Sequence, residues 1–123
     1  MERIAVYGTL KKGYWNYERF IEPHLESGKV RFVGNGIVRG YLIGGDVIPF
    51  AKRTNNQDNY IKVEVYEIND EKVMRSIDQL EGAYKKVKVK VEMNNGEIID
   101  AFMYDGSHLT SHAFAKSYEE LIY

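Results

Sequence analysis

The stretch YIKVEVYEINDEKVMRSIDQLEGAYKKVKVKVEM, residues 60–93, contains the two periodicities that decide the fold. Residues 60–68 alternate between apolar and polar side chains, and this pattern predicts a β-strand with one buried face. Residues 84–93 alternate more strictly, with valines expected inward and lysines outward. Between the two strands, residues 69–82 show helical spacing of apolar residues. The stretch therefore predicts strand, helix and strand in succession.

Typical start and stop residues at the two ends support the central helix. Asn69 or Asp70 can cap its N-terminus, and Asp70 with Glu71 complements the positive end of the helix dipole. Gly82 can end it. The helix is the clearest in the sequence.

The flanking sequence predicts mostly strands. Glycines 34, 36 and 40 suggest bulges or sharp bends, as expected where a sheet curls. The other expected strands cover residues 3–7, 29–45, 47–53 and 97–106, with a hairpin turn at Asn95–Gly96. A short helix is expected within residues 13–28, where Pro23 interrupts it or lies at a break in it. The tail, residues 108–123, is expected to form a weak helix or to lie on the body. We expect an α+β fold, with a curled, mixed or antiparallel β-barrel-like sheet and two or three short helices.

The composition narrows the class of protein. With 123 residues, 44% hydrophobic and 28% charged, the chain is predicted to form a single globular domain over residues 1–123. Seventeen basic and eighteen acidic residues give a net charge of -1, so neither nucleic acid nor a membrane is an expected partner. Cysteine is absent, which excludes disulfides, thiolate metal sites and a cysteine nucleophile. No apolar run approaches the roughly 20 residues of a membrane span, and the N-terminus lacks a signal-peptide pattern. We expect a cytoplasmic protein.

The stretch IAVYGTL, residues 4–10, ends an expected strand in a glycine turn. Most such turns only reverse the chain. Exposed backbone N–H groups in a turn also bind anions. The sequence leaves both interpretations open.

Glu81 breaks the apolar pattern of the central helix. It follows Ile77 by four residues and Met74 by seven, so it falls on the face expected to meet the core. A carboxylate there must be solvated, paired or shifted upward in pKa, and the last case suits a general acid or base. A helix-terminal glutamate is more commonly a plain surface residue, and both readings stay open.

Other signals are weaker. His108 and His112 have the spacing of some zinc peptidases but lack the glutamate after the first histidine, so we expect no metal site. The glycines of residues 34–40 do not have nucleotide-binding spacing. The lysines of residues 85–90 are expected to form a solvated strand face that resists edge-to-edge pairing.

Several motifs in order resemble the gamma-glutamylcyclotransferase-like superfamily, of the gamma-glutamylamine cyclotransferase type. They are VYGTLKKG at residues 6–13, GIVRGYLI and GGDVIPFA at residues 36–51, VEVYEIND and SIDQLEG at residues 63–82, YKKVKVKV at residues 84–91 and AFMYDG at residues 101–106; Asn16 also falls where the family often has asparagine. The chain departs from the family in one loop. Only Ala83 separates Gly82 from Tyr84, where an aromatic-proline insertion is common, and this leaves the identity of the substrate open.

The resemblance implies a small-molecule γ-glutamyl substrate, which an enzyme of this type converts to 5-oxoproline and a free amine without a cofactor. It places the catalytic role on Glu81 as general acid–base and substrate binding on Tyr7, Gly8, Thr9, Leu10, Tyr84 and Tyr104. Two alternatives remain: a catalytically silent relative that binds a small metabolite in the same pocket, and a small β-barrel interaction module. A monomer and a homodimer are equally compatible with the sequence.

Overall fold

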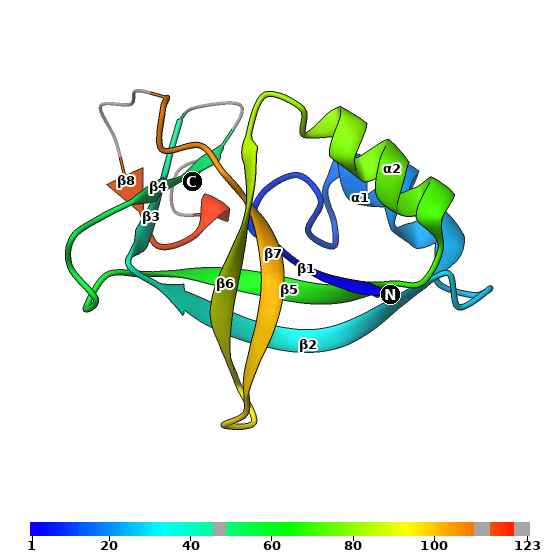
Figure 1. Cartoon of the computed structure of the whole chain (residues 1–123), viewed down its shortest axis with the longest axis horizontal. Coiled ribbons are helices and arrows are strands. Elements are labelled where there is room, and N and C mark those ends of the chain that lie inside the picture. The colour runs from blue at the N-terminus through cyan, green and yellow to red at the C-terminus, as the bar shows by residue number, and fades with distance from the viewer. Residues whose placement is uncertain (46–48, 110–113, 120–123) are drawn as a thin grey trace.

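The computed structural model describes residues 1–45, 49–109 and 114–119, and Figure 1 shows its elements. The strands are β1 (Glu2–Val6), β2 (Val30–Arg39), β3 (Tyr41–Gly44), β4 (Phe50–Arg53), β5 (Tyr60–Ile68), β6 (Lys85–Met93), β7 (Ile98–Asp105) and β8 (Phe114–Ala115); the helices are α1 (Trp15–Phe20), α2 (Glu71–Leu80) and a 3₁₀ turn, η1 (Glu22–His24).

Five strands close into a barrel in the order β1-β5-β2-β6-β7, and a parallel contact of Ile4 with Phe102 joins β7 back to β1. The other pairings within the barrel are antiparallel. A further parallel contact joins β4 to β7 at Ala51 and Asp105, so the sheet is mixed. The predicted α+β fold with a curled, barrel-like sheet is confirmed.

The remaining strands lie beside the barrel. β3 pairs with β4 and also with β8, which belongs to the tail (Figure 1). The described part of the tail therefore lies on the body, one of the two arrangements expected for it. The rest of the tail, at residues 110–113 and 120–123, and the start of the strand predicted over residues 47–53 lie outside the described residues.

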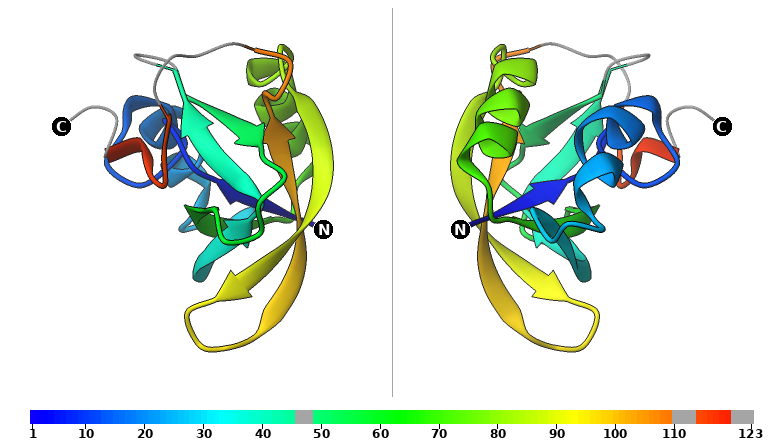
Figure 2. Two further views of the ribbon diagram at one scale, coloured as in Figure 1. Left: turned by 90° about the vertical axis from the view of Figure 1, so that its left-hand side faces the viewer. Right: turned by 90° about the vertical axis from the view of Figure 1, so that its right-hand side faces the viewer.

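Alternating side chains build two buried clusters. Ile61, Val63 and Val65 of β5 point into the barrel, where they meet buried residues of β2, β6 and β7. On the other side, β1 and β5 pack against Tyr17 of α1 and Ile77 of α2. Burying one such aliphatic side chain is worth about 1.5–3 kcal/mol. Both helices thus cover the same side of the barrel, as Figures 1 and 2 show.

Two glycines shape β2 as predicted. Pairing of β2 with β5 shifts register between Phe32 and Gly34, which is the expected bulge. At Gly36, an added Cβ would lie 2.6 Å from the carbonyl oxygen of Glu92, so glycine allows β2 and β6 to approach closely. Beyond this point the two strands diverge.

The helix predicted within residues 13–28 is shorter than its apolar spacing suggests. α1 ends at Phe20, and η1 follows with Pro23 inside it. Proline has no N–H to continue the α-helical ladder, which explains the break. Among the described residues, no helix is long and apolar enough to cross a membrane.

Asp70 rather than Asn69 caps α2. Its Oδ1 accepts hydrogen bonds from the backbone N–H groups of Lys72 (2.9 Å) and Val73 (3.0 Å). Asp70→Ala is expected to lower the melting temperature by about 3–5 °C because two helix-terminal donors lose their acceptor. Thermal unfolding followed by circular dichroism measures this. Lys72→Ala in the same turn is the control, and an equal decrease there would contradict a capping role.

Candidate active site

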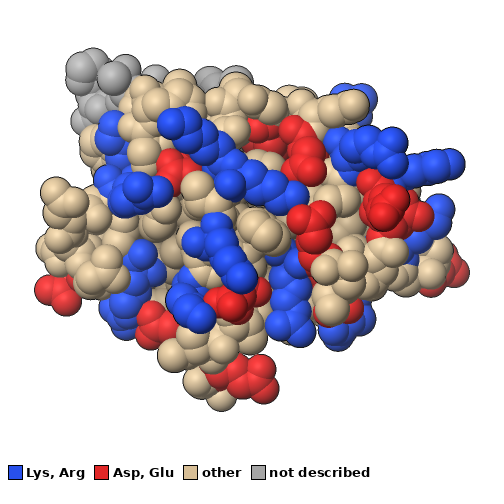
Figure 3. All heavy atoms as spheres, viewed as in Figure 1, with Lys and Arg blue, Asp and Glu red and all other residues tan. Residues whose placement is uncertain are grey.

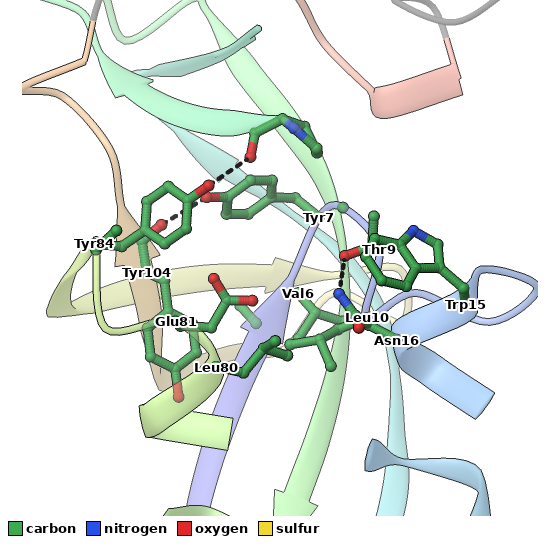
Figure 4. A pocket seen from close by; sticks show the side chains of 14 residues that line it. Val6, Tyr7, Thr9, Leu10, Trp15, Asn16, Leu80, Glu81, Tyr84 and Tyr104 are labelled. Carbon is green, nitrogen blue, oxygen red and sulfur yellow. Dashed lines mark hydrogen bonds between the residues drawn. The ribbon is translucent and has the colours of Figure 1, made fainter. Parts of the chain in front are cut away.

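A cavity of about 280 Å³ opens where the end of β1, the start of α1 and the end of α2 meet. All the residues predicted for the site line it: Tyr7, Gly8, Thr9, Leu10, Glu81, Tyr84 and Tyr104. Its volume is just below the roughly 300–1,000 Å³ found for ligand pockets. The structure thus brings the first turn and the mid-chain carboxylate into one hollow (Figure 4).

Glu81 follows the last residue of α2 and its carboxylate points into this cavity (Figure 4). It is partly buried. None of the described residues donates a hydrogen bond to its carboxylate or forms an ion pair with it. Burial raises the pKa of Glu81 from 4.5 to about 7. A group with this pKa both accepts and donates protons near neutral pH.

The turn after β1 presents backbone donors. The carbonyl oxygen of Gly8 accepts a hydrogen bond from the Lys11 N–H (2.9 Å), and that of Thr9 accepts one from Tyr17 (3.0 Å). The N–H groups of Gly8, Thr9 and Leu10 have no acceptor among the described residues. Consecutive unpaired N–H groups on a cavity wall are typical of a site that binds an anion or a developing oxyanion.

Asn16 fixes this turn, although neither periodicity nor spacing pointed to it. Its side-chain amide is buried on α1 and donates a hydrogen bond from Nδ2 to Oγ1 of Thr9 at 2.7 Å (Figure 4). Because Oγ1 accepts this bond, the Thr9 hydroxyl hydrogen is left to donate elsewhere. The sequence pointed to Asn16 through the resemblance alone, at a position where that family often has asparagine.

Three tyrosines form the opposite wall. Tyr7 donates a hydrogen bond to the Tyr104 carbonyl oxygen (2.7 Å), and Tyr104 donates to Asp78 (2.8 Å), so the Tyr104 hydroxyl points away from the cavity. Tyr84 donates to the Pro49 carbonyl oxygen (3.4 Å). Burial, and to a lesser degree the Glu81 carboxylate, raises the pKa of all three phenols. They remain neutral and supply shape rather than charge.

The mouth of the cavity is apolar. Trp15 is 59% exposed and Leu80 is 38% exposed, and both line the cavity. Leu80 is the last residue of α2, and this position places it on the rim. The shortened loop after Glu81 closes tightly, since the Tyr84 N–H donates to the Glu81 carbonyl oxygen (3.0 Å), and it leaves the cavity open.

Glycine at position 8 is required by close packing rather than by backbone conformation. A Cβ there would lie 2.6 Å from Cγ of Pro49. Gly8→Ala is expected to displace the turn, to lower the free energy of unfolding by about 1–2 kcal/mol and to lower any kcat/KM about tenfold. Urea unfolding and a turnover assay measure the two effects.

Gly96→Ala is the matched control for Gly8→Ala. Gly96 has a φ of +92° in the β6–β7 turn, and an added Cβ would meet no atom within 4 Å. The control should lose stability through backbone strain and keep its kcat/KM. Equal loss of turnover in both variants would show that stability, not the position of the turn, governs the rate.

The described residues contain no cluster of three or more His, Asp or Glu side chains able to hold a metal ion. Of the histidine pair noted in the sequence, His112 lies outside the described residues, and Nε2 of His108 lies 3.0 Å from the Ala83 carbonyl oxygen.

The cavity combines two chemically useful features: a carboxylate of raised pKa, that of Glu81, and the free backbone N–H groups of Gly8, Thr9 and Leu10.

Known proteins resemble this chain in sequence and in fold. The family described as gamma-glutamyl cyclotransferase, AIG2-like, matches residues 4–118. A Methanocaldococcus jannaschii protein named "Putative gamma-glutamylcyclotransferase" is 38% identical over 108 residues, which cover 85% of this chain and 83% of that protein.

Two further similarities extend over most of the chain. A Danio rerio protein named gamma-glutamylaminecyclotransferase B is 30% identical over 115 residues, covering 85% of this chain and 59% of that protein. The crystal structure of an AIG2-like protein from Mus musculus superimposes with a TM-score of 0.79 at 24% identity, covering 100% of this chain and 95% of that one, and so has the same fold.

Proposed function

The chain belongs to the gamma-glutamyl cyclotransferase, AIG2-like family, and from this premise we propose that it converts a γ-glutamyl amine or peptide to 5-oxoproline and a free amine. Glu81 acts as general acid–base, and the turn from Tyr7 to Leu10 binds the substrate. One observation carries the proposal: a carboxylate of pKa about 7 and unpaired N–H groups share a small cavity.

The reaction begins with a proton transfer. The substrate's α-ammonium gives a proton to the Glu81 carboxylate, and the free amine nitrogen attacks the side-chain amide carbon of the same substrate. A new C–N bond closes the five-membered ring, and negative charge develops on the carbonyl oxygen. Because the nucleophile belongs to the substrate, no nucleophilic side chain is needed.

The reaction ends by breaking the original amide bond. Glu81, now protonated, returns its proton to the departing nitrogen as the C–N bond breaks. The ring nitrogen loses its second proton to the released amine, so the products are 5-oxoproline and an ammonium ion, and the carboxylate is regenerated. A pKa near 7 serves both transfers, because a strongly acidic group would bind the proton too weakly and a strongly basic one would not release it.

The turn stabilises the negative charge. Other atoms of the turn hold its backbone in place: the carbonyl oxygens of Gly8 and Thr9 accept backbone hydrogen bonds, and the Thr9 side chain accepts one from Asn16. The free N–H groups of Gly8, Thr9 and Leu10 therefore need little reorganisation. One such donor is worth about 3 kcal/mol in comparable oxyanion sites. The apolar rim of Trp15 and Leu80 would contact the part of the substrate that leaves as the amine.

A relative that only binds a metabolite is the alternative. For holding a carboxylate, an unpaired Glu81 is a disadvantage because like charges repel and its own desolvation is uncompensated. For proton transfer it is the required group. The site therefore favours a reaction over binding alone.

The test incubates the protein with a panel of γ-glutamyl amines and dipeptides and measures 5-oxoproline by mass spectrometry. We expect release from at least one substrate, and 5-oxoproline itself should shift the amide resonances of Gly8 to Leu10. Shifts in that turn without turnover of any substrate would favour the binding protein. Neither turnover nor shifts would contradict both functions of the cavity.

A further inference from the structure

A second hollow, of about 440 Å³, lies outside the proposed active site, where β2 and β6 diverge. One wall is Val87–Lys90 of β6, and the other includes Val38–Tyr41 and Arg53. β2 pairs with β6 only at Gly36–Met93 and Ile37–Glu92. The hollow thus occupies a gap in the sheet where a strand is missing between two neighbours.

β6 has an unpaired edge along this gap. Its other edge pairs with β7 from Lys85 to Glu92, whereas no strand of the described chain pairs with the gap-side edge before Glu92. The Glu92 carbonyl oxygen and the Asn94 N–H both face β2. Since backbone direction alternates along a strand, the N–H and C=O groups of Lys86, Lys88 and Lys90 face the gap.

The walls of the gap combine positive charge with apolar surface. Arg39, Arg53, Lys88 and Lys90 line it against a single acidic residue, Glu92. Figure 3, drawn in the same view as Figure 1, shows basic side chains gathered over this part of the molecule. Val87 and Val89 are only half-buried, although they point toward the core.

The ion pairs of these cations leave positive charge available. Arg39 pairs with Glu92 (2.6 Å) and Arg53 with Asp105 (3.1 Å). Lys88 and Lys90 share one carboxylate, that of Asp100, at 4.0 and 2.7 Å, and their side chains are 67% and 75% exposed. Two exposed ammonium groups on one carboxylate leave about one net charge for a ligand.

Three occupants of the edge can be compared. A second copy of β6 would place lysine opposite lysine, which is repulsive. Single-stranded nucleic acid binds by stacking bases on exposed aromatic rings, and Tyr41, the one aromatic residue among the described lining residues, is buried. An extended peptide with acidic side chains satisfies both the backbone groups and the charge.

We propose that the gap-side edge of β6, from Lys86 to Lys90, binds an extended peptide as an added strand, in which acidic residues alternate with small apolar ones. The apolar side chains cover Val87 and Val89, and the acidic ones lie across from Lys88 and Lys90. The same lysines prevent self-association of the edge and select the charge of the partner.

The test uses a fluorescein-labelled eight-residue peptide of alternating Glu and Val, with fluorescence anisotropy for affinity and amide resonances for location. We expect saturable binding that shifts Lys86 to Lys90, and a Kd at least about tenfold higher for the double variant Lys88→Glu, Lys90→Glu. The matched control, Lys29→Glu with Lys72→Glu, makes the same charge change elsewhere and should keep the Kd within about twofold.

Two further ligands separate strand addition from simple charge attraction. A peptide of the same sequence with every backbone nitrogen methylated cannot form the strand ladder in either orientation and should bind at least about tenfold more weakly. Equal binding of the methylated peptide, shifts outside β6, no binding by the acidic peptide, or tighter binding of an eight-nucleotide oligothymidine would each overturn the proposal.

Discussion

Glu81→Gln is expected to lower the kcat for 5-oxoproline release by about 10²- to 10⁴-fold, the range for loss of a general acid–base. Glutamine has nearly the shape of glutamate, so the cavity and the tyrosines around it are preserved. It cannot take a proton from the α-ammonium or return one to the leaving nitrogen. The rate should fall while binding of 5-oxoproline to the turn remains.

The control for this variant is on the same helix. Glu71→Gln makes the same chemical change in the first turn of α2, far along the helix from the cavity, and should keep kcat within about twofold. The decisive comparison is kcat for both variants on the best substrate of the panel. Turnover by Glu81→Gln within about tenfold of the native rate would remove Glu81 from the proton-transfer role.

The central part of the fold, residues 60–93, was predictable because its apolar residues follow strand or helix spacing almost throughout. The alternation of residues 60–68 and 84–93 corresponds to β5 and β6, and helical spacing between them corresponds to α2. Gly34 and Gly36 indicated a bulge and a close approach, and both are present. Local patterns suffice where each residue's position in an element is set by burial on one face.

Barrel closure could not be derived from pattern. It depends on one parallel contact, Ile4 with Phe102, between strands almost a hundred residues apart in sequence. Neither strand carries a local sequence signal that specifies its partner. The curled sheet was an expectation from glycines, and the meeting of β1 with β7 had to be seen.

In the site, too, local sequence patterns identified single residues, whereas their meeting in space depended on tertiary packing. Glu81 could be found because a carboxylate on an apolar stripe violates the helical pattern, and the Gly8 turn because it ends a strand. Their common cavity follows from tertiary packing of α2 against β1. Asn16 and the exposed rim residue Trp15 were missed as members of the site, since a buried amide and an exposed indole leave no periodic signal.

The second large effect is on stability: ionisation of Glu81 is expected to lower the free energy of unfolding as the pH rises. Burial raises the pKa of Glu81 to about 7 in the folded protein, against 4.5 for an ordinary glutamate. Between these values the folded state holds a proton that the unfolded state has lost, so the free energy of unfolding falls with increasing pH. The loss levels off above the folded-state pKa.

The magnitude follows from the same two values. Between pH 5 and pH 8 the contribution of Glu81 to the free energy of unfolding should decrease by roughly 2–3 kcal/mol. Total stabilities of small proteins are about 5–15 kcal/mol, so this is a large fraction. Other titrating groups change over the same range, and the native curve alone would not isolate Glu81.

Glu81→Gln isolates it, because glutamine does not titrate and the other groups are unchanged. Urea unfolding of both proteins at pH 5 and pH 8 should show the variant gaining about 2–3 kcal/mol relative to the native protein as the pH rises. A difference that stays constant with pH would mean that the carboxylate is solvated in the folded state. Since the native rate should rise through the same titration, near pH 7, the charge that activates the site is also the charge that destabilises the fold.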